Sequence, residues 1–237
     1  MYLGRKNKIE FTPERKEERK AKYSMVVLDF DGTLADTKES IIEAFQKTFK
    51  QLNLPPLNEK LFEKFIGLPL ESTFKNTTQL KGKSLEKAIK LYRKNYNEIS
   101  QKSVRLFPEV KETLEKLKQQ GVKIVLVSNK GEGALKKLLS ELEIDHYFSL
   151  IIGEEKMKEK KPSPSVIKEI LKKQKLEPKE VLIVGDTKYD IQMGKNANCK
   201  TCAVFYGYGN LKEIKENSPD YTIKKFSDIL KIVFTGV

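Results

Sequence analysis

The sequence predicts an α/β fold in which a parallel sheet is covered by helices on both faces and an all-helical segment is inserted after the first strand. Two observations lead to this prediction. From Pro108 onward, segments with the helical spacing of apolar residues alternate with short apolar runs. Residues 36–107 instead contain successive helical patterns with no convincing strand between them.

The elements follow from these patterns in chain order. The run "MVVLDF" within residues 24–30 predicts the first strand. The insertion is predicted to hold four helices, because apolar residues recur three or four positions apart, over 38–52, 58–66, 70–78 and 83–100. Later apolar runs predict strands at 122–128, 148–152, 181–185 and 201–205. Amphipathic segments around them predict helices at 109–120, 132–142, 164–174, 188–197 and 211–217.

Composition restricts the class of protein. Hydrophobic residues make up 38% of the 237 residues and charged residues 33%, which is typical of a globular chain. No apolar run reaches the roughly 18 residues of a membrane span, and "MYLGRKNKIEF" lacks the apolar core of a signal peptide. We therefore expect a cytoplasmic protein with no membrane partner.

The net charge of +13 makes nucleic acid a partner to consider. The lysines, however, stand beside glutamates on predicted helix faces, as in "EVKETLEKLKQQ", and no basic stripe with aromatic residues occurs. We expect solvated helix faces and no nucleic-acid binding. The charge excess would favour a small anionic substrate by long-range attraction.

Two features have no predicted part in the chemistry. Cys199 and Cys202 form a C-x-x-C pair where a helix gives way to a strand, and one histidine cannot complete a zinc site, so buried free thiols are expected. Residues 1–22 are polar and of mixed charge, and we interpret them as an N-terminal extension outside the fold.

Polar side chains follow three of the predicted strands. Asp29 and Asp31 end the first strand, Ser128 and Asn129 end the second, and "GDTKYD" (185–190) ends the fourth. The carboxyl edge of such a sheet is where ligands bind, and the helical insertion should lie over it. Clustered carboxylates need a cation, and ligands that are all oxygen favour Mg²⁺. One aspartate can then attack phosphorus while the other transfers protons.

These motifs resemble those of the haloacid dehalogenase superfamily, over about residues 24–232. The similarity lies in "DFDGTLADT", "VSN", "KPSP" and "VGDTKYD". The resemblance implies a Rossmann-like core formed by residues 23–35 and 108–237, with residues 36–107 as a helical cap. It also implies Mg²⁺-dependent hydrolysis of a phosphomonoester through an aspartyl-phosphate intermediate.

The resemblance assigns roles by position. Asp29 is implied to be the nucleophile and Asp31 the general acid/base, which also offers its main-chain carbonyl to Mg²⁺. Asp186 is implied to be the third protein contact to the metal. Ser128 and Asn129 would bind phosphate oxygens.

Four further residues complete the predicted site. Lys161 would offset the charge of the nucleophile and the phosphate. Asp190 would be a supporting carboxylate that holds Lys161 or a metal-bound water. Gly185 and Thr33 are the further supporting residues.

The branch of the superfamily is suggested by two local features. Asp31 favours phosphoryl chemistry over dehalogenation, and "FIGLPLEST" (65–73) resembles the cap loop of phosphoglycolate phosphatase-like members. No arginine closely follows Gly67, which makes a mutase less favoured. The alternatives are a phosphomutase or pyrophosphatase of the same superfamily, or a binding protein that keeps the fold without turnover. The exact substrate and the oligomeric state are left open.

The N-terminal extension leads to a first prediction. Because every residue with a predicted role lies downstream of it, deleting residues 1–20 should leave kcat/KM within a few-fold of the full-length value, about 1 kcal/mol or less. Steady-state kinetics at low and high salt test this. A tenfold loss at low salt alone would indicate steering of the substrate, and an equal loss at both would make the extension part of the site.

Overall fold

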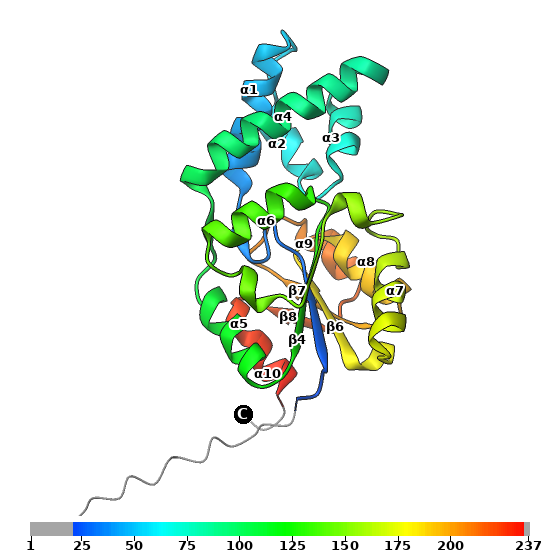
Figure 1. The fold of residues 1–237 in the computed structure, drawn as a ribbon. Coiled ribbons are helices and arrows are strands. Elements are labelled where there is room, and N and C mark those ends of the chain that lie inside the picture. Colours follow the sequence, from blue (N-terminus) through cyan, green and yellow to red (C-terminus); the bar gives the residue numbers. More distant parts are fainter. Residues whose placement is uncertain (1–20, 235–237) are drawn as a thin grey trace, which may run out of the picture.

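The computed structural model describes residues 21–234, and its centre is a six-stranded sheet in which every strand pairs in parallel (Figure 1). The strand order is β5-β4-β1-β6-β7-β8. The strands are β1 (Met25–Leu28), β4 (Lys123–Val127), β5 (Leu150–Ile152), β6 (Val181–Gly185), β7 (Lys200–Val204) and β8 (Tyr221–Ile223). Together with the covering helices, this order confirms the predicted α/β fold class.

Both faces of the sheet are buried because side chains alternate along each strand. Val26 and Leu28 belong to one apolar cluster, whereas Met25 and Val27 belong to another. The first face is covered by α5 (Val110–Gln119), α6 (Glu132–Glu141) and α10 (Ile229–Val233). The second is covered by α7 (Ser165–Gln174) and α8 (Lys188–Asn196). The remaining helix of the core is α9 (Leu211–Glu216).

The topology brings three strand ends together. After β5 at one edge, the chain returns through α7 to β6, on the opposite side of β1 from β4. The central strand β1 is therefore flanked by β4 and β6, with Leu28 opposite Leu126 and Val184. The carboxyl ends of these three strands form the crevice at which open α/β sheets bind ligands.

A helical layer lies over that edge of the sheet (Figure 1). It contains α1 (Lys38–Gln51), α2 (Glu59–Phe62), α3 (Leu70–Thr77) and α4 (Gly82–Ser103). Phe45 is at its centre, with ring centroids of Phe62, Phe74 and Tyr92 within 4.9 Å. We call residues 36–107 the cap, and the assignment of those bounds to a separate domain stays a prediction.

Two short strands that the sequence pattern did not indicate join the cap to the core. β2 (Ala35–Asp36) and β3 (Arg105–Leu106) pair in antiparallel fashion, Ala35 opposite Leu106. Each has only two residues, too few for a strand pattern to be recognised. The chain thus enters and leaves the cap side by side, which makes this pair the hinge of the cap.

Other differences from the sequence-based elements are small. β8 and α10 were not predicted, since both are short and β8 is an edge strand of three residues. The first strand ends at Leu28 rather than residue 30, because the chain turns out of the sheet there. Short 3₁₀ helices occupy Glu63–Phe65, Asp145–Tyr147, Glu154–Lys156, Pro178–Glu180 and Phe226–Asp228. The predicted extension 1–22 lies outside the described residues except for Ala21 and Lys22.

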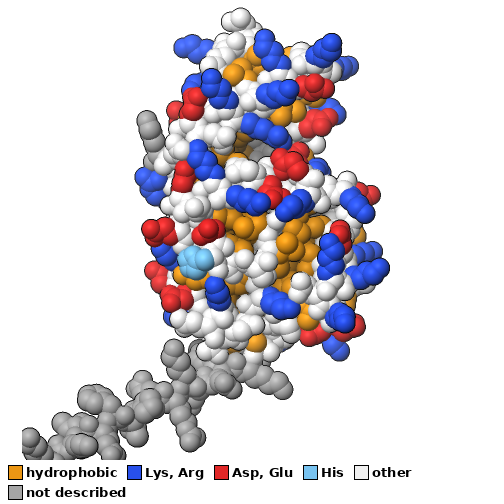
Figure 2. Space-filling model, viewed as in Figure 1, with side chains coloured by type: hydrophobic (Ala, Val, Ile, Leu, Met, Phe, Trp, Pro, Cys, Tyr) orange, Lys and Arg blue, Asp and Glu red, His pale blue; other side chains and the backbone are white. Residues whose placement is uncertain are grey.

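The surface and the cysteines agree with the sequence analysis. Lysine and arginine side chains are dispersed among acidic ones on the visible face, over both cap and core (Figure 2). Cys199 and Cys202 are free and buried, and burial raises their thiol pKa values to about 11 and about 12. Among residues 21–234, no helix combines the length and apolar character needed to cross a bilayer.

Candidate active site

The two aspartates of the first motif both follow β1, and the chain turns out of the sheet between them. The amide of Asp29 still donates to Val184 of the neighbouring strand, at 3.0 Å. The chain then turns, with the amides of Leu34 and Ala35 donating to the carbonyl of Phe30. Gly32 has a φ of +79°, and a Cβ there would lie 2.3 Å from Asp186 Oδ2. Glycine is therefore required for the turn that sends Asp31 away from the sheet.

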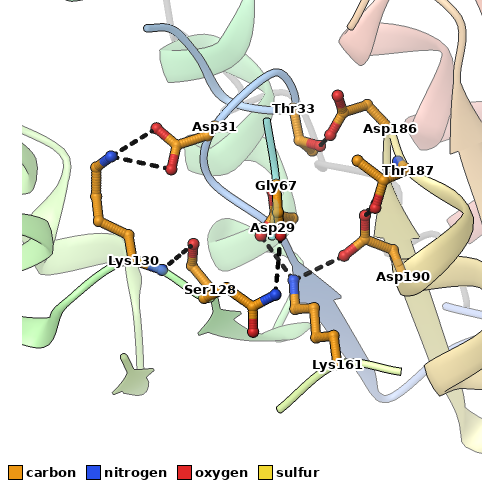
Figure 3. Close-up of polar contacts among 11 residues, drawn as sticks. Asp29, Asp31, Thr33, Gly67, Ser128, Lys130, Lys161, Asp186, Thr187 and Asp190 are labelled. Atoms are coloured by element: carbon orange, nitrogen blue, oxygen red, sulfur yellow. Dashed lines mark hydrogen bonds and ion pairs between the residues drawn. The ribbon is translucent and has the colours of Figure 1, made fainter. Parts of the chain in front are cut away.

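Lys161 contacts the Asp29 carboxylate within the crevice (Figure 3). Its Nζ lies 2.6 Å from Asp29 Oδ1 and 2.7 Å from Asp190 Oδ1, and all three side chains are buried. Burial alone would lower the pKa of Lys161, but the charges of Asp190 and Asp29 outweigh it and raise that pKa above its usual value. Lys161 therefore remains a cation between two carboxylates.

Asp190 is positioned by the start of α8. Its Oδ2 accepts from the main-chain nitrogen of Thr187 at 3.1 Å and from the Thr187 hydroxyl at 2.6 Å, in a capping box. A Cβ on Gly185 would lie 2.2 Å from the Asp190 carboxyl carbon. The same carboxylate thus caps a helix and binds Lys161, and Gly185 leaves the room for it.

Asp186 completes an acidic cluster. Its Oδ1 accepts from the Thr33 hydroxyl at 3.1 Å, and its Oδ2 accepts from the main-chain nitrogen of Tyr208 at 2.8 Å. Oxygen atoms of Asp29, Asp186 and Asp190 lie within 4.8 Å of one another, all on buried residues. Such a set of hard oxygen ligands is suited to a divalent cation.

The electrostatics of the cluster also favour a cation. Burial raises the pKa of Asp29 to about 7, with Lys161 opposing and the charges of Asp190 and Asp31 adding to the rise. Burial likewise raises the pKa of Asp186 well above its usual value, and the charges of Asp29 and Asp190 raise it further. Both carboxylates are therefore short of positive charge in the protein alone.

Ser128 and Asn129 follow β4 and face the same crevice. The Ser128 hydroxyl accepts from the main-chain nitrogen of Lys130 at 3.2 Å. The Asn129 side-chain nitrogen donates to the carbonyl of Gly67 at 2.9 Å, whereas its Oδ1 is buried without a partner among residues 21–234. In this conformation Asn129 therefore links the core to the cap loop, a contact that the sequence did not suggest.

Asp31 points away from the acidic cluster, toward the cap. Its carboxylate accepts from the Thr37 hydroxyl at 2.7 Å, and Lys130 Nζ lies 2.9 and 3.0 Å from its two oxygens. Asp29 and Asp31 both line a cavity of about 260 Å³ between cap and core. Asp31 thus shares a cavity with Asp29 but lies outside the acidic cluster.

Sequence reasoning missed two residues of this arrangement, Lys130 and Tyr208. Lys130 directly follows the second motif, and its position after a strand end was the available signal. Tyr208 belongs to "YGYG" (206–209), which follows β7 at the same edge. A Cβ on Gly209 would lie 1.9 Å from the Asp186 carbonyl oxygen, so this loop is fitted closely against the site.

The comparisons with known proteins identify the family. A family model described as "Haloacid dehalogenase-like hydrolase" matches residues 26–204, more than half of the chain. The chain belongs to this family of hydrolases. The predicted resemblance to the superfamily, and the prediction that the chain is one of its enzymes, are thereby confirmed.

Two curated haloacid dehalogenase-like relatives and one solved structure match most of the chain. A phosphoglycolate phosphatase of Aquifex aeolicus is 38% identical over 211 residues, covering 88% of this chain and 96% of the relative. A pyrophosphatase of Oceanobacillus iheyensis is 33% identical over 208 residues, covering 88% and 95%. The crystal structure of a predicted phosphoglycolate phosphatase from Haemophilus somnus has a TM-score of 0.80 at 31% identity, covering 89% and 98%.

Tyr208 gives a prediction about this haloacid dehalogenase-like site. Its hydroxyl lies 2.5 Å from the Thr37 amide, 3.1 Å from the Lys38 amide and 2.7 Å from Asp36 Oδ1, at the cap hinge. Tyr208→Phe should lower the free energy of unfolding by about 1–2 kcal/mol, because these groups lose a partner. It should also speed hydrogen exchange of the Thr37 and Lys38 amides, measured by NMR.

Tyr206→Phe is the matched control, because the Tyr206 hydroxyl donates to the Thr33 carbonyl at 2.7 Å and does not touch the hinge. It should cost similar stability while the two hinge amides exchange at the wild-type rate. Unchanged exchange in Tyr208→Phe would show that Tyr208 does not link the cap hinge to the core.

Proposed function

We propose that this chain is a Mg²⁺-dependent phosphatase that hydrolyses a small phosphomonoester, of the phosphoglycolate type, through an aspartyl-phosphate intermediate. One observation carries the proposal: Asp29 is held against Lys161 at the floor of a cavity, while Asp31 lines the same cavity on the side of the cap. A nucleophile and a proton donor are thereby presented to opposite ends of one phosphate ester bond.

The proposed reaction has two steps. In the first, a carboxylate oxygen of Asp29 forms a bond to phosphorus, the ester bond breaks, and the leaving oxygen takes a proton from Asp31. In the second, Asp31 takes a proton from water, whose oxygen attacks phosphorus, and the bond to Asp29 breaks to release phosphate. Ser128 and Asn129 are proposed to bind phosphate oxygens, and Lys161 to stabilise the charge that develops on them.

The metal has a defined place in this proposal. Asp29 and Asp186 would hold it through carboxylate oxygens and Asp31 through its main-chain carbonyl, while Asp190 keeps Lys161 in position. When bound, Mg²⁺ supplies positive charge to the phosphate oxygens and to the buried carboxylates. The raised pKa values of Asp29 and Asp186 support the need for such a charge.

The size of the substrate is supported by the cavity. About 260 Å³ below the cap, part of which the transferred phosphate would fill, leaves room for a small leaving group. The relatives named as phosphoglycolate phosphatases agree with this choice. Pyrophosphate is the second candidate, because a relative named as a pyrophosphatase is 33% identical over 88% of the chain. The cytoplasmic location expected from the sequence is part of the proposal.

The nucleophile can be tested by Asp29→Asn. The change removes the attacking carboxylate oxygen and one metal ligand but keeps the shape of the side chain, so phosphate release should be abolished while the fold persists. Phosphate release and circular dichroism measure the two outcomes. Asp145→Asn, at a half-exposed carboxylate far from the site, is the matched control and should keep full turnover. Turnover near the wild-type rate in Asp29→Asn would rule out this nucleophile.

Removal of the metal is the next test. EDTA should abolish phosphate release and added Mg²⁺ should restore it, because the carboxylate cluster is not competent when it is not neutralised. The Mg²⁺ concentration that gives half-maximal activity should also fall as pH rises. Since the pKa of Asp29 is about 7 without metal, protons compete with Mg²⁺ below that pH, and the half-saturating Mg²⁺ concentration should fall between about pH 6 and about pH 8. Full activity after chelation would contradict the metal site.

A further inference from the structure

Lys130 has no part in the reaction proposed above, yet it lies inside the cavity. Its side chain is 10% exposed, and its Nζ contacts both carboxylate oxygens of Asp31 at 2.9 and 3.0 Å. The same ammonium lies 4.2 Å from the ring centroid of Tyr96 on α4. Figure 3 shows the Lys130 side chain reaching the Asp31 carboxylate. With its contact to Tyr96, Lys130 therefore lies between the proposed proton donor of the core and the wall of the cap.

Tyr96 supplies a second, independent feature. It is buried, lines the cavity, and its hydroxyl has no hydrogen-bond partner within the described part of the chain. A buried hydroxyl without a partner costs free energy, which a bound polar group would recover. The rest of the cap wall is largely apolar, with Phe45, Phe62 and Ile66 among its residues. A polar ligand atom in this part of the cavity would therefore be drawn to the Tyr96 hydroxyl and the Lys130 ammonium.

A second cation at the cavity, Arg93, is placed differently. It is half-exposed at the rim, and its Nη2 lies 3.6 Å from Glu154 and 3.4 Å from Glu155. Two carboxylates therefore oppose its single charge, and an anion placed beside it would meet both of them. Lys130 faces one carboxylate, Asp31, which also keeps a hydrogen bond from Thr37. Lys130 is thus the cation better placed to bind a second anion.

We propose that Lys130 and Tyr96 recognise an oxyanion on the leaving-group side of the substrate, next to the scissile ester oxygen. The ammonium has three protons, and the two oxygens of Asp31 use at most two of them, so one remains for a ligand. A carboxylate or a second phosphate group supplies this chemistry equally well. The inference rests on the proposed phosphatase activity and deepens it by naming the residues that would recognise the anionic leaving group of such a substrate.

The test compares two substrates at a time, one with and one without an oxyanion group on the leaving-group side. Phosphoglycolate is paired with hydroxyethyl phosphate, which has a hydroxymethyl group in place of the carboxylate. Pyrophosphate is paired with p-nitrophenyl phosphate, whose leaving group is of comparable basicity but lacks the second phosphate group. The quantity measured is the ratio of kcat/KM within each pair, from phosphate release with Mg²⁺. A change that only disturbs Asp31 slows both members of a pair and leaves the ratio unaltered, whereas loss of oxyanion recognition lowers the ratio.

Lys130→Met should lower the ratio for the pair that contains the preferred oxyanion by about tenfold to a hundredfold. Lys130→Arg should keep most of the ratio, because the charge remains. Tyr96→Phe should lower it by about threefold or more, because one hydrogen bond to the oxyanion is lost. The pair whose ratio falls further in Lys130→Met tells whether the oxyanion is a carboxylate or a phosphate.

Arg93→Gln is the matched control and should leave both ratios within about twofold of wild type, as its charge is already opposed at the rim. A fall in the ratio with Arg93→Gln but not with Lys130→Met would overturn the proposal, as would wild-type ratios near one for both pairs. Those results would leave the proposed phosphatase intact. Failure of the wild-type protein to release phosphate from any of the four substrates would instead refute the phosphatase, and this inference with it.

Discussion

The arrangement of the site depends on one buried ammonium group, that of Lys161, set between Asp29 and Asp190. Three charged groups removed from water are costly unless each finds partners, and here each partner comes from a different segment of the chain. Asp190 is held as a partner of Lys161 because the start of α8 fixes its carboxylate. Asp29 is held as the other partner because it follows β1, the central strand. A local helix cap and the position of one strand therefore determine where the Asp29 carboxylate points.

Among the contacts that join the cap to this arrangement are those of Tyr208, Asn129 and Lys130 of the core. Tyr208 binds the hinge with its hydroxyl and Asp186 with its main-chain nitrogen, so one residue connects the acidic cluster to the entrance of the cap. Asn129 binds the carbonyl of Gly67 in the cap loop. Lys130 reaches the ring of Tyr96 on α4. The position of the cap and the geometry of the site are thus physically coupled.

Much of the fold was predictable because its signals are local. The strands around Val26, Leu126 and Val184 are continuous apolar runs, which is how strands buried on both faces read in a sequence. Asp29, Asp31 and Asp186 were predictable as a group because each follows such a run. Lys130, Tyr96 and Tyr208 were not, because their importance arises from contacts between residues that are distant in the sequence, such as Lys130 and Tyr96. The two-residue strands of the hinge carry no periodicity at all.

The charge of the whole chain does not replace these local contacts. Among the described residues at the site, the carboxylates of Asp29, Asp31, Asp186 and Asp190 meet the ammonium groups of Lys161 and Lys130. With all four carboxyl groups ionised, two negative charges are left unbalanced before any phosphate enters. The net charge of +13 is spread over exposed lysines, whose field is screened over about 8–10 Å at physiological salt. Compensation must therefore come from within the crevice, where the proposed divalent cation would supply the charge that balances the carboxylates and where Lys130 would face the substrate.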